Sequence, residues 1–464
     1  MKTLNQYLFI ITFLIIGSCI KQQPEENIAS EIKPYSKNPR YWQFKGQPTL
    51  LLGGTNNDNL FQSNHLEAHL DSLEAAGGNY IRNTMSDRDP GDQRAFAKMG
   101  NGKYDLNKWN DLYWQKFESL MSMTKERDII VQVEIWDRFD HSQDFWIDDP
   151  YHPKNNINYT YDQVNLDSLY LEHAYLNRHP FFFTIPELDN NTILLGFQQA
   201  FVDKILSISS KYNHVLYCID NETSGAEEWP IFWASYIRSK TADRDMMITE
   251  MWDPWKVNDE MHHRTYDHPE SYDFIDISQN SHITGEENWE NAQYVWKYIS
   301  QHPRPINHTK IYGHDRGKWV ADGKDGEHGK QTFFRNLLGG SASSRFHRPP
   351  NGLGLSPESI YAIKTIREVE KLVKFWDVVP QMDLLSQNEP EEAYITAKEG
   401  EKYLIYFTGT GSVQLDLSKQ HGSFTAKFID VNSAKWMDPK DLLAGDVVNL
   451  TSNIDGGSLL VLHR

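Results

Sequence analysis

The stretch HVLYCIDNETSG, from His214 to Gly225, places three hydrogen-bonding side chains directly after an apolar run. Because the run is rich in β-forming residues, we expect Asp220, Asn221 and Glu222 at the end of a buried strand. Polar groups brought to one place in a fold need a ligand, water or one another as hydrogen-bond partners. This motif therefore predicts a functional site.

Polar and aromatic side chains follow seven other apolar runs as well. The candidates at those run ends are Asn56, Arg82, Glu134, Trp136, Glu250, Trp252, His282, His308, Lys310, Tyr312, His314, Asp315 and Arg345. Carboxylates and amides suit the hydroxyl groups of a sugar, and tryptophan rings suit its C–H faces. Breaking a glycosidic bond then needs one protonated carboxyl group and a second group on the opposite side. We expect Glu222, Glu250, His314 and Asp315 to be catalytic, and Asn221 with the other candidates to bind substrate.

The elements that must position these groups alternate along the chain. Apolar runs, separated by helix-like segments, are expected as strands at Thr49–Gly54, Asn79–Met85, Asp128–Trp136, His214–Asp220, Met246–Trp252, Phe274–Asn280, Pro305–Gly313 and Gly339–His347. Near-continuous apolar strands separated by helices indicate a parallel sheet. Eight such units predict an α/β fold, a (β/α)₈ TIM barrel over residues 39–380, with its active site at the carboxyl ends of the strands. An open doubly wound sheet is the main alternative, but no glycine-rich dinucleotide turn supports it.

The pattern changes beyond Pro380. A helix is expected before it, with Ser356 as N-cap and Pro357 at the first helical position. After it come short alternating runs broken by Gly and Asn. Residues 381–464 therefore predict a small antiparallel β-sandwich.

The first residues have the features of an export signal. Lys2 precedes an apolar stretch that is too short for a good membrane span, and Ile16-Gly17-Ser18-Cys19 is similar to a bacterial lipobox. We expect residues 1–18 to be a lipoprotein signal peptide, Cys19 to be lipidated and to anchor the chain to a bacterial membrane, and residues 19–38 to be a flexible tether. An ordinary signal peptide with an incidental cysteine is the alternative. Only Cys218 then remains, which excludes an intrachain disulfide.

DNETSGAEEW, which contains Asn221-Glu222, resembles the Asn-Glu signature of clan A glycoside hydrolases. The overall plan is also similar to secreted barrels of polysaccharide-degrading bacteria that carry a C-terminal β-domain named for collagen binding; Arg82 and the AKWMDP segment fit that plan. The resemblance implies that Glu222 is the acid/base. Its nucleophile, a glutamate at the end of strand seven, has no match, because PINHTKIYGHD has His308, Thr309 and Lys310 there.

Three explanations of the missing nucleophile stay open. Glu250, Asp315 or Glu134, in that order, takes the role; or Glu222 works with water in an inverting reaction. The third is elimination from a uronic-acid-containing oligosaccharide, which needs a base, groups that neutralise a carboxylate and an acid. The residue types for it, His308, Lys310, Tyr312, His314 and Arg82, are present. A non-catalytic glycan-binding lipoprotein is a further alternative.

The charge and the remaining motifs limit the partners. A formal net charge of −18 over 464 residues argues against a nucleic-acid partner. DGKDGEHG, residues 322–329, lacks the spacing of a calcium loop, and the histidines near His262 match no zinc motif. We therefore expect no metal and no cofactor, and a plant or algal poly- or oligosaccharide as the partner.

Overall fold

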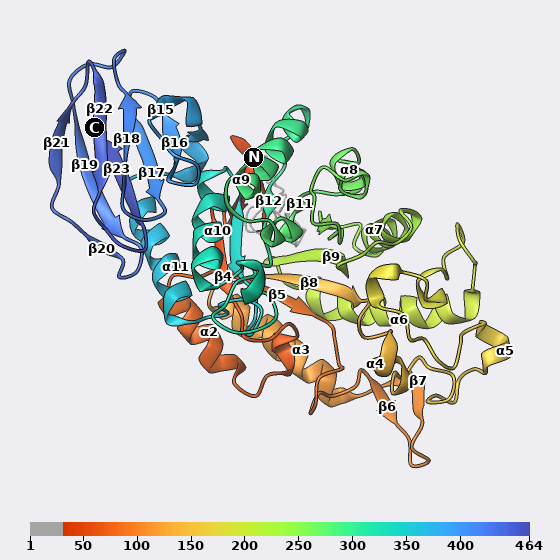
Figure 1. The fold of residues 1–464 in the computed structure, drawn as a ribbon. Coiled ribbons are helices and arrows are strands. Elements are labelled where there is room, and N and C mark those ends of the chain that lie inside the picture. Colours follow the sequence, from red (N-terminus) through yellow and green to blue (C-terminus); the bar gives the residue numbers. More distant parts are fainter. Residues whose placement is uncertain (1–30) are drawn as a thin grey trace, which may run out of the picture.

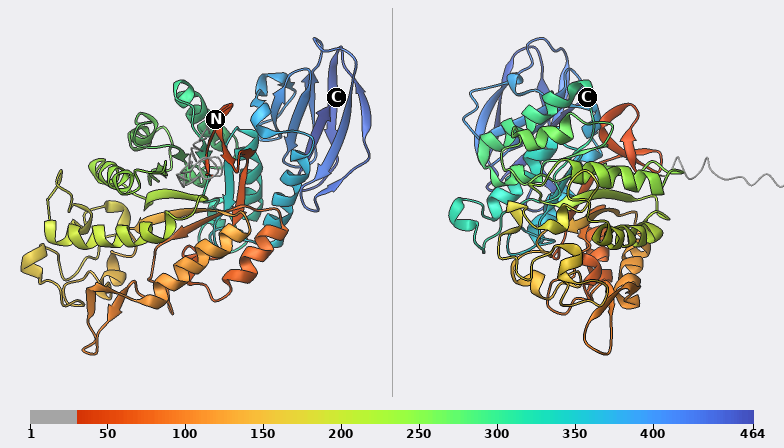
Figure 2. Two further views of the ribbon diagram at one scale, coloured as in Figure 1. Left: turned by 180° about the vertical axis from the view of Figure 1, so that it is seen from behind. Right: turned by 90° about the vertical axis from the view of Figure 1, so that its right-hand side faces the viewer.

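The computed structural model describes residues 31–464. A parallel sheet lies at the centre with helices around it, and antiparallel strands form the C-terminal end of the molecule (Figures 1 and 2). The predicted signal peptide, Cys19 and the first part of the predicted tether lie outside the described residues.

The central sheet has six parallel strands in the order β10-β9-β8-β5-β4-β13. These strands are β4 (Leu51–Gly54), β5 (Tyr80–Thr84), β8 (Ile130–Asp137), β9 (Val215–Asn221), β10 (Met247–Thr249) and β13 (Ser343–Phe346). A separate parallel pair consists of β11 (Ile275–Asp276) and β12 (Ile306–Asn307). Every residue of these strands is buried, which explains their near-continuous apolar runs.

The predicted parallel α/β arrangement is confirmed, but a closed eight-stranded barrel is not detected among residues 31–464. Scattered backbone hydrogen bonds replace ladders on both sides of the β11–β12 pair. Asp273 N donates to Ile248 O (2.8 Å) on one side, and on the other Ala342 N donates to Ile306 O (2.8 Å) and Arg345 N donates to His308 O (3.0 Å). β11 and β12 are shorter than predicted because side chains bond the backbone after them. The Ser278 hydroxyl accepts from Thr309 N (2.7 Å) and Lys310 N (3.2 Å).

The helices surround the central sheet (Figure 1). The longer ones are α2 (Leu66–Ala75), α3 (Asp111–Glu126), α6 (Thr192–Ser209), α7 (Glu228–Lys240), α8 (Glu260–Tyr266), α9 (Gly285–Tyr298), α10 (Gly326–Leu338) and α11 (Pro357–Glu370). The shorter ones are α4 (Gln143–Ile147) and α5 (Tyr161–Val164), with 3₁₀ turns η1 (Leu60–Gln62), η2 (Ala174–Leu176), η3 (Pro180–Phe182), η4 (Ser278–His282), η5 (Ile299–Gln301), η6 (Val320–Asp322), η7 (Phe375–Asp377) and η8 (Met382–Leu384).

Helix starts follow the capping rules that the sequence indicates. The Ser356 hydroxyl accepts from Ser359 N (3.3 Å), with Pro357 as the first helical residue of α11, as predicted. Asn110 caps α3 in the same way, through Leu112 N. Among residues 31–464, every helix is either too short or too polar to cross a membrane.

Two segments at one end of the molecule were not predicted. A hairpin of β6 (Phe96–Lys98) and β7 (Tyr104–Trp109) follows β5, and residues 138–191 separate β8 from α6. They lie at the opposite end from the C-terminal strands (Figures 1 and 2). The segment 138–191 is an extension over the carboxyl end of the sheet, where it supplies part of the candidate site.

The prediction of a flexible tether is wrong for residues 31–38. They contain β1 (Lys33–Tyr35), which pairs with β2 (Asn38–Phe44), and β2 pairs with β3 (Gln47–Thr49). Ile32 is only 3% exposed, and its N–H donates to Asn213 O (2.9 Å). The composition of this segment is polar apart from Ile32, and the burial of that one side chain attaches the segment to the rest of the protein.

The C-terminal residues form two antiparallel sheets, as predicted. The larger has the order β14-β16-β17-β23-β19-β20, with β21 also paired to β19; the smaller has the order β15-β18-β22. The strands are β14 (Val379–Pro380), β15 (Leu385–Ser386), β16 (Ala393–Lys398), β17 (Lys402–Phe407), β18 (Gly411–Asp416), β19 (Ser423–Asp430), β20 (Lys435–Trp436), β21 (Lys440–Leu443), β22 (Val447–Ser452) and β23 (Ser458–His463).

Three neighbouring strands of the larger C-terminal sheet, β16, β17 and β23, are buried on both faces. Ile395, Ile405 and Leu460 share one apolar core with residues of the smaller sheet. Tyr394 and Tyr406, one position along on β16 and β17, belong to the core of the main α/β part. Alternate residues of each strand therefore join the two parts of the protein.

Candidate active site

A cavity of about 420 Å³ opens at the carboxyl end of the central sheet, where the sequence predicts the site. A cavity of this volume can hold a small ligand or one end of a larger ligand. The lining residues come from strand ends and the loops that follow them: Asp58, Arg82, Arg88, Phe139, His173, Tyr175, Asn221, Glu222, Asp253, Trp255, Gln279, His282, Lys310, Tyr312, Lys318, Trp319, His347, Arg348 and Asn351.

Glu222 follows the last residue of β9 and has a left-handed backbone, with φ of 55°. Hydrogen bonds between the turn and the next strand hold this conformation: Thr223 N donates to Met251 O (2.9 Å), and Asp253 N donates to Thr223 O (2.9 Å). A residue other than glycine is strained in the left-handed backbone region, so its surroundings must hold it in that conformation. The turn directs the Glu222 carboxylate into the cavity.

Two donors bind the same oxygen of Glu222. Lys310 Nζ lies 2.7 Å from Glu222 Oε1, and the Tyr312 hydroxyl donates to it at 2.9 Å. Burial raises the pKa of Glu222, but the Lys310 ammonium and the hydrogen bonds outweigh burial and hold this pKa well below its ordinary value. Glu222 is therefore an anion in the unliganded site.

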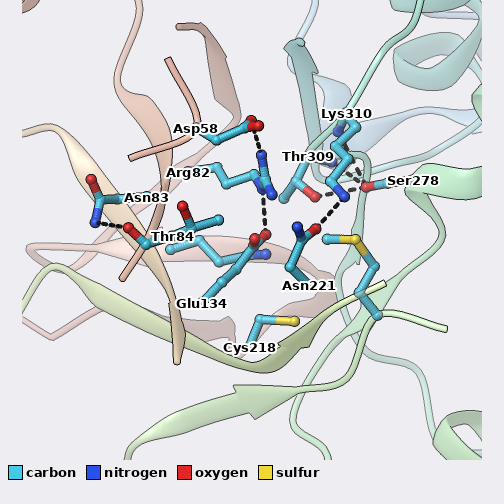
Figure 3. A network of polar contacts seen from close by, with 12 residues as sticks. Asp58, Arg82, Asn83, Thr84, Glu134, Cys218, Asn221, Ser278, Thr309 and Lys310 are labelled. Carbon is cyan, nitrogen blue, oxygen red and sulfur yellow. Dashed lines mark hydrogen bonds and ion pairs between the residues drawn. The ribbon is translucent and has the colours of Figure 1, made fainter. Parts of the chain in front are cut away.

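Asn221 completes this arrangement. Its side-chain amide donates to Asp137 Oδ2 (3.0 Å), and its amide oxygen accepts from Lys310 Nζ. Figure 3 shows Lys310 reaching Asn221 from the segment after β12. The Asn-Glu pair of the motif thus holds one lysine from the segment where the clan A nucleophile would stand.

Asp253 is a second carboxyl group at the cavity. It comes shortly after β10, and its backbone is held by the Thr223 contact described above. Burial and then the negative charge of Glu222 raise the pKa of Asp253 to about 6. Of these two carboxyl groups, Glu222 therefore stays ionised and Asp253 holds a proton near pH 6.

Arg82 links the strands beneath the cavity. Its Nε donates to Glu134 Oε1 (2.6 Å), and its Nη1 forms an ion pair with Asp58 (Figure 3). Asp58 also pairs with Arg348 from the segment after β13. Burial raises the pKa of Asp58, but Arg82, His347 and Arg348 hold it well below the ordinary value. This network fixes the charged floor of the site.

One wall of the cavity is aromatic. The Trp255 ring stacks on His282 (centroids 4.4 Å apart), and His282 stacks on Tyr312 (4.2 Å). Trp319 meets His282 edge to face at 5.0 Å. Burial lowers the pKa of His282 to about 3, so this ring is neutral. Neutral stacked rings are suited to the C–H face of a sugar.

Six of the predicted site residues meet at the cavity: Arg82, Asn221, Glu222, His282, Lys310 and Tyr312. Nine others do not line it: Asn56, Glu134, Trp136, Trp252, Glu250, His308, His314, Asp315 and Arg345. The strand-end position of these nine was predicted from the sequence, but the direction of each side chain depends on its partners.

Glu250 is the most important correction. It is fully buried beneath the cavity, and its Oε1 accepts from Asp220 N (3.0 Å) and Met251 N (2.8 Å). Burial and the neighbouring Asp220 raise its pKa well above the ordinary value. The expectation that Glu250 is the second catalytic carboxylate is therefore wrong, because no part of it lines the cavity.

Buried partners account for four further corrections. The Glu134 carboxylate forms a buried ion pair with Arg82. Trp136 and Trp252 are 1% exposed, and the Trp252 indole donates to Thr265 Oγ1 (2.6 Å). The fourth, Arg345, donates to the Thr309 carbonyl and to the Thr55 hydroxyl.

The other four corrections lie further along the loops. His308 Nε2 pairs with the Ser341 hydroxyl (3.1 Å), and Asn56 accepts from Leu355 N (3.0 Å). His314 Nδ1 accepts from Arg316 N (3.0 Å), and Asp315 is exposed beside it. His308, Asn56 and His314 therefore hold the backbone and side chains around the site, and Asp315 faces solvent.

Sequence reasoning missed several lining residues, among them Arg88, His173, Tyr175, Trp319 and Arg348. Most come from long loops, whose path no periodicity predicts. Asp58 and Asp253 stand at the ends of predicted strands, although neither was selected as a catalytic or substrate-binding residue. Within residues 31–464, no group of three or more His, Cys, Asp or Glu side chains is arranged to hold a metal ion.

Comparison with known proteins identifies the fold. No protein-family model matches the sequence, and the search of curated proteins gave no match. A solved structure described as a glycoside hydrolase has a TM-score of 0.63 and 12% identity, over 94% of this chain and 97% of the other. A family 5 glycoside hydrolase from Bacteroides vulgatus has a TM-score of 0.62 and 13% identity, over 94% of each chain.

The amylase AmyB from Thermotoga neapolitana, described as a noncanonic maltogenic α-amylase, has a TM-score of 0.53 and 10% identity, over 89% of this chain and 99% of the other. The expected resemblance to glycoside hydrolases is thus confirmed at the level of the fold. It extends over nearly the whole chain, including the C-terminal strands in the first two comparisons.

Proposed function

We propose that this chain is a carbohydrate-active enzyme that hydrolyses a glycosidic bond of an oligo- or polysaccharide, on an α/β fold derived from a (β/α)₈ barrel. The observation that carries the proposal is Glu222, ionised at the end of β9 and facing a cavity that also holds the protonatable Asp253. The shared fold of the glycoside hydrolases supports it but does not establish the activity.

Asp253 and Glu222 have different roles in the proposed reaction. Glycosidic cleavage needs a proton for the departing oxygen and an anion that activates water or attacks the sugar. Asp253, with a pKa of about 6, is the proton donor. Glu222, which Lys310 and Tyr312 keep ionised, is the base or nucleophile rather than the acid that the clan A resemblance implies. The proton moves from the Asp253 carboxyl group to the departing glycosidic oxygen as the C–O bond breaks.

Mass spectrometry of the products tests this mechanism. Wild-type protein incubated with plant and algal oligosaccharides gives fragments whose masses add up to the substrate plus one water. Glu222→Gln, which keeps the shape but removes the charge, loses nearly all turnover. Undiminished hydrolysis by Glu222→Gln would contradict the central role of Glu222, and undiminished hydrolysis by Asp253→Asn would contradict the role of Asp253.

A second candidate is elimination from a uronic acid residue. The observation that favours it is that Lys310 and Tyr312 bind Glu222 in a cavity whose lining has five Lys or Arg side chains and three carboxyl groups. Cations neutralise the uronate carboxylate, a base takes the proton next to it, and a C=C bond forms as the β C–O bond breaks and its oxygen is protonated. An ultraviolet-absorbing unsaturated uronate would identify this reaction, with a new reducing end if the departing group is a sugar and none if it is water; new reducing ends without that absorbance exclude it.

A third candidate is a lipoprotein that binds glycan without cleaving it. The lining residues that favour it are the exposed ring of Trp255 and its neighbours in the aromatic wall. Binding isotherms that survive Glu222→Gln, with no product from any glycan, would identify this function.

We also propose that the chain is exported and held on a bacterial membrane, at the cell surface or facing the periplasm, through a lipid on Cys19. The support is the Ile16–Cys19 sequence that resembles a lipobox. Labelled palmitate given to the producing cells is expected in the wild-type protein and absent from Cys19→Ala. Equal release of both proteins into the soluble fraction would contradict the anchor.

A further inference from the structure

The side chains that line the cavity include more cations than carboxyl groups, although the protein is strongly acidic. Its lining includes five Lys or Arg side chains, Arg82, Arg88, Lys310, Lys318 and Arg348, and three carboxyl groups, Asp58, Glu222 and Asp253. The whole chain has a formal net charge of −18. Cations without a carboxylate partner attract anions to a cavity, so the pairing of these side chains bears on the substrate.

Four of the five lining cations are already paired with carboxylates. Arg82 and Arg348 pair with Asp58, Arg88 pairs with Asp137 and Asp140, and Lys310 pairs with Glu222. Lys318 forms no ion pair with a carboxylate in the part of the chain that the structure describes. Its ammonium lies 4.2 Å from the centre of the Trp319 ring.

Lys324 belongs to the same group, although it does not itself line the cavity. It is 4% exposed, and its ammonium lies 4.6 Å from the centre of the Trp255 ring and 4.7 Å from that of Trp319. The backbone N–H of Lys324 donates to Trp319 O (3.2 Å), which fixes the backbone of this loop. No carboxylate of residues 31–464 forms an ion pair with it; Asp322 is the acidic group that acts on it at longer range.

The aromatic rings thus hold two ammonium groups at the cavity without neutralising them. Cation–π contacts position a charge but leave its formal value unchanged. Both lysines, together with Lys310, act on His282 at the centre of the aromatic wall and lower its pKa, in addition to the effect of burial. Of these three ammonium groups, only Lys310 has a carboxylate partner among residues 31–464.

We infer that Lys318 and Lys324, held by Trp255 and Trp319, form a subsite for a negatively charged sugar residue next to the site of cleavage. The ligand chemistry is a carboxylate or a sulfate ester on the sugar, because either accepts charge-assisted hydrogen bonds from ammonium groups. This inference rests on the proposed carbohydrate-active function and specifies the class of its substrate.

Affinity chromatography tests the subsite without requiring turnover. The full mature protein carrying Glu222→Gln is immobilised, and mixed digests of uronate-containing and sulfated algal polysaccharides are passed over it before and after carboxyl reduction and before and after desulfation. We expect charged oligosaccharides to be retained and their neutralised counterparts to elute. Loss on carboxyl reduction identifies a uronate, and loss on desulfation identifies a sulfate ester.

The matched variants separate local charge from total charge. In the same background, Lys318→Met with Lys324→Met is expected to weaken retention about fivefold or more, since an ion pair of this kind contributes about 1 kcal/mol. Lys211→Met with Lys440→Met removes two exposed lysines elsewhere and leaves retention unchanged. Lys318→Met alone, at an exposed position, keeps the test valid if the buried Lys324 is needed for folding.

Each outcome decides the inference. Equal retention by the double variant, equal retention of neutralised sugars, or no retention at all would overturn it. Turnover of the same digests by wild-type protein is measured separately. Hydrolysis of neutral oligosaccharides without retention of charged ones would reject the anionic subsite and keep the proposed function; charged ligands bound without any product would do the reverse.

Discussion

Two pairs of carboxyl groups lie near the end of β9, and the two pairs differ in how their protons are distributed. Glu222 is ionised and Asp253 has a raised pKa, and both line the cavity. Asp220 and Glu250, directly beneath, are fully buried, and Asp220 Oδ1 and Glu250 Oε2 have no hydrogen-bond partner among the described residues. Two adjacent buried carboxyl groups cannot both ionise, so this pair shares one proton, which stays on Glu250 because Arg138 pairs with Asp220 (3.1 Å).

The pH dependence of hydrolysis follows from the first pair. Asp253 must hold its proton, so kcat/KM is expected to fall as the pH rises through about 6. Glu222 must be ionised, and because its pKa is lowered, activity persists at pH values below the ordinary pKa of a glutamate. Asp253→Asn is expected to cost roughly 100-fold in rate and to remove the fall above pH 6. A profile that keeps this fall in Asp253→Asn would assign it to another group.

The second pair predicts how Glu250 tolerates substitution. Glu250→Gln keeps an oxygen that accepts from Asp220 N and Met251 N, and its amide N–H replaces the shared proton. We expect its unfolding temperature at pH 7 to equal or exceed that of the wild type. Glu250→Leu leaves two buried N–H groups without acceptors and is expected to lower the free energy of unfolding by about 3 kcal/mol.

The sign of the pH effect checks the same assignment. A carboxyl group whose pKa is raised by folding stabilises the folded state below its unfolded pKa, and this contribution is lost as the pH rises through the folded value. The wild-type unfolding temperature is therefore expected to decrease relative to that of Glu250→Gln as the pH rises above the ordinary carboxyl range. Glu250→Gln as unstable as Glu250→Leu at every pH would show that Glu250 is ionised instead.

At the scale of elements, periodicity predicted the strands better than their ends. Each of the eight predicted segments contains strand residues, but only two residues of Pro305–Gly313 form β12. The apolar pattern could not show that Ser278 would take over the hydrogen bonds of Thr309 and Lys310. Carboxyl-end positions located the site, while the loops that bring Arg88, Tyr175 and Trp319 to it have no repeating pattern.

The first strand offers a test of a wrong prediction. Because Ile32 is buried, Ile32→Ala is expected to lower the free energy of unfolding by roughly 2–4 kcal/mol. Lys37→Ala, in the exposed turn between β1 and β2, is the control and leaves it unchanged. Denaturant unfolding measures both. If residues 31–38 were a flexible tether, the two variants would behave alike.

At the scale of the whole molecule, the C-terminal sandwich is continuous with the main α/β part. The larger sheet packs on α10 and α9 through aromatic pairs: Phe334 with Tyr406 (4.9 Å) and Trp289 with Tyr394 (4.9 Å). The Tyr394 hydroxyl donates to Glu286 (3.2 Å), and Lys330 Nζ donates to Asn432 (2.8 Å). α10 thus lies between this sheet and the central sheet, and it follows directly on the loop that carries Lys318 and Lys324. The sandwich supports the site through that helix.

Shared packing predicts that the two parts unfold together. Scanning calorimetry of the full mature chain is expected to show one transition. Phe334→Ala removes a fully buried ring that packs against Tyr406 of the larger C-terminal sheet and is expected to shift that whole transition downward, with a loss of about 3–5 kcal/mol. Phe424→Ala, in the inner core of the sandwich, is expected to shift the same transition, because the sandwich has no separate stability to lose. Two transitions, with Phe424→Ala moving only one of them, would show instead that the sandwich is an independent module and that its contact with α10 does not support the site.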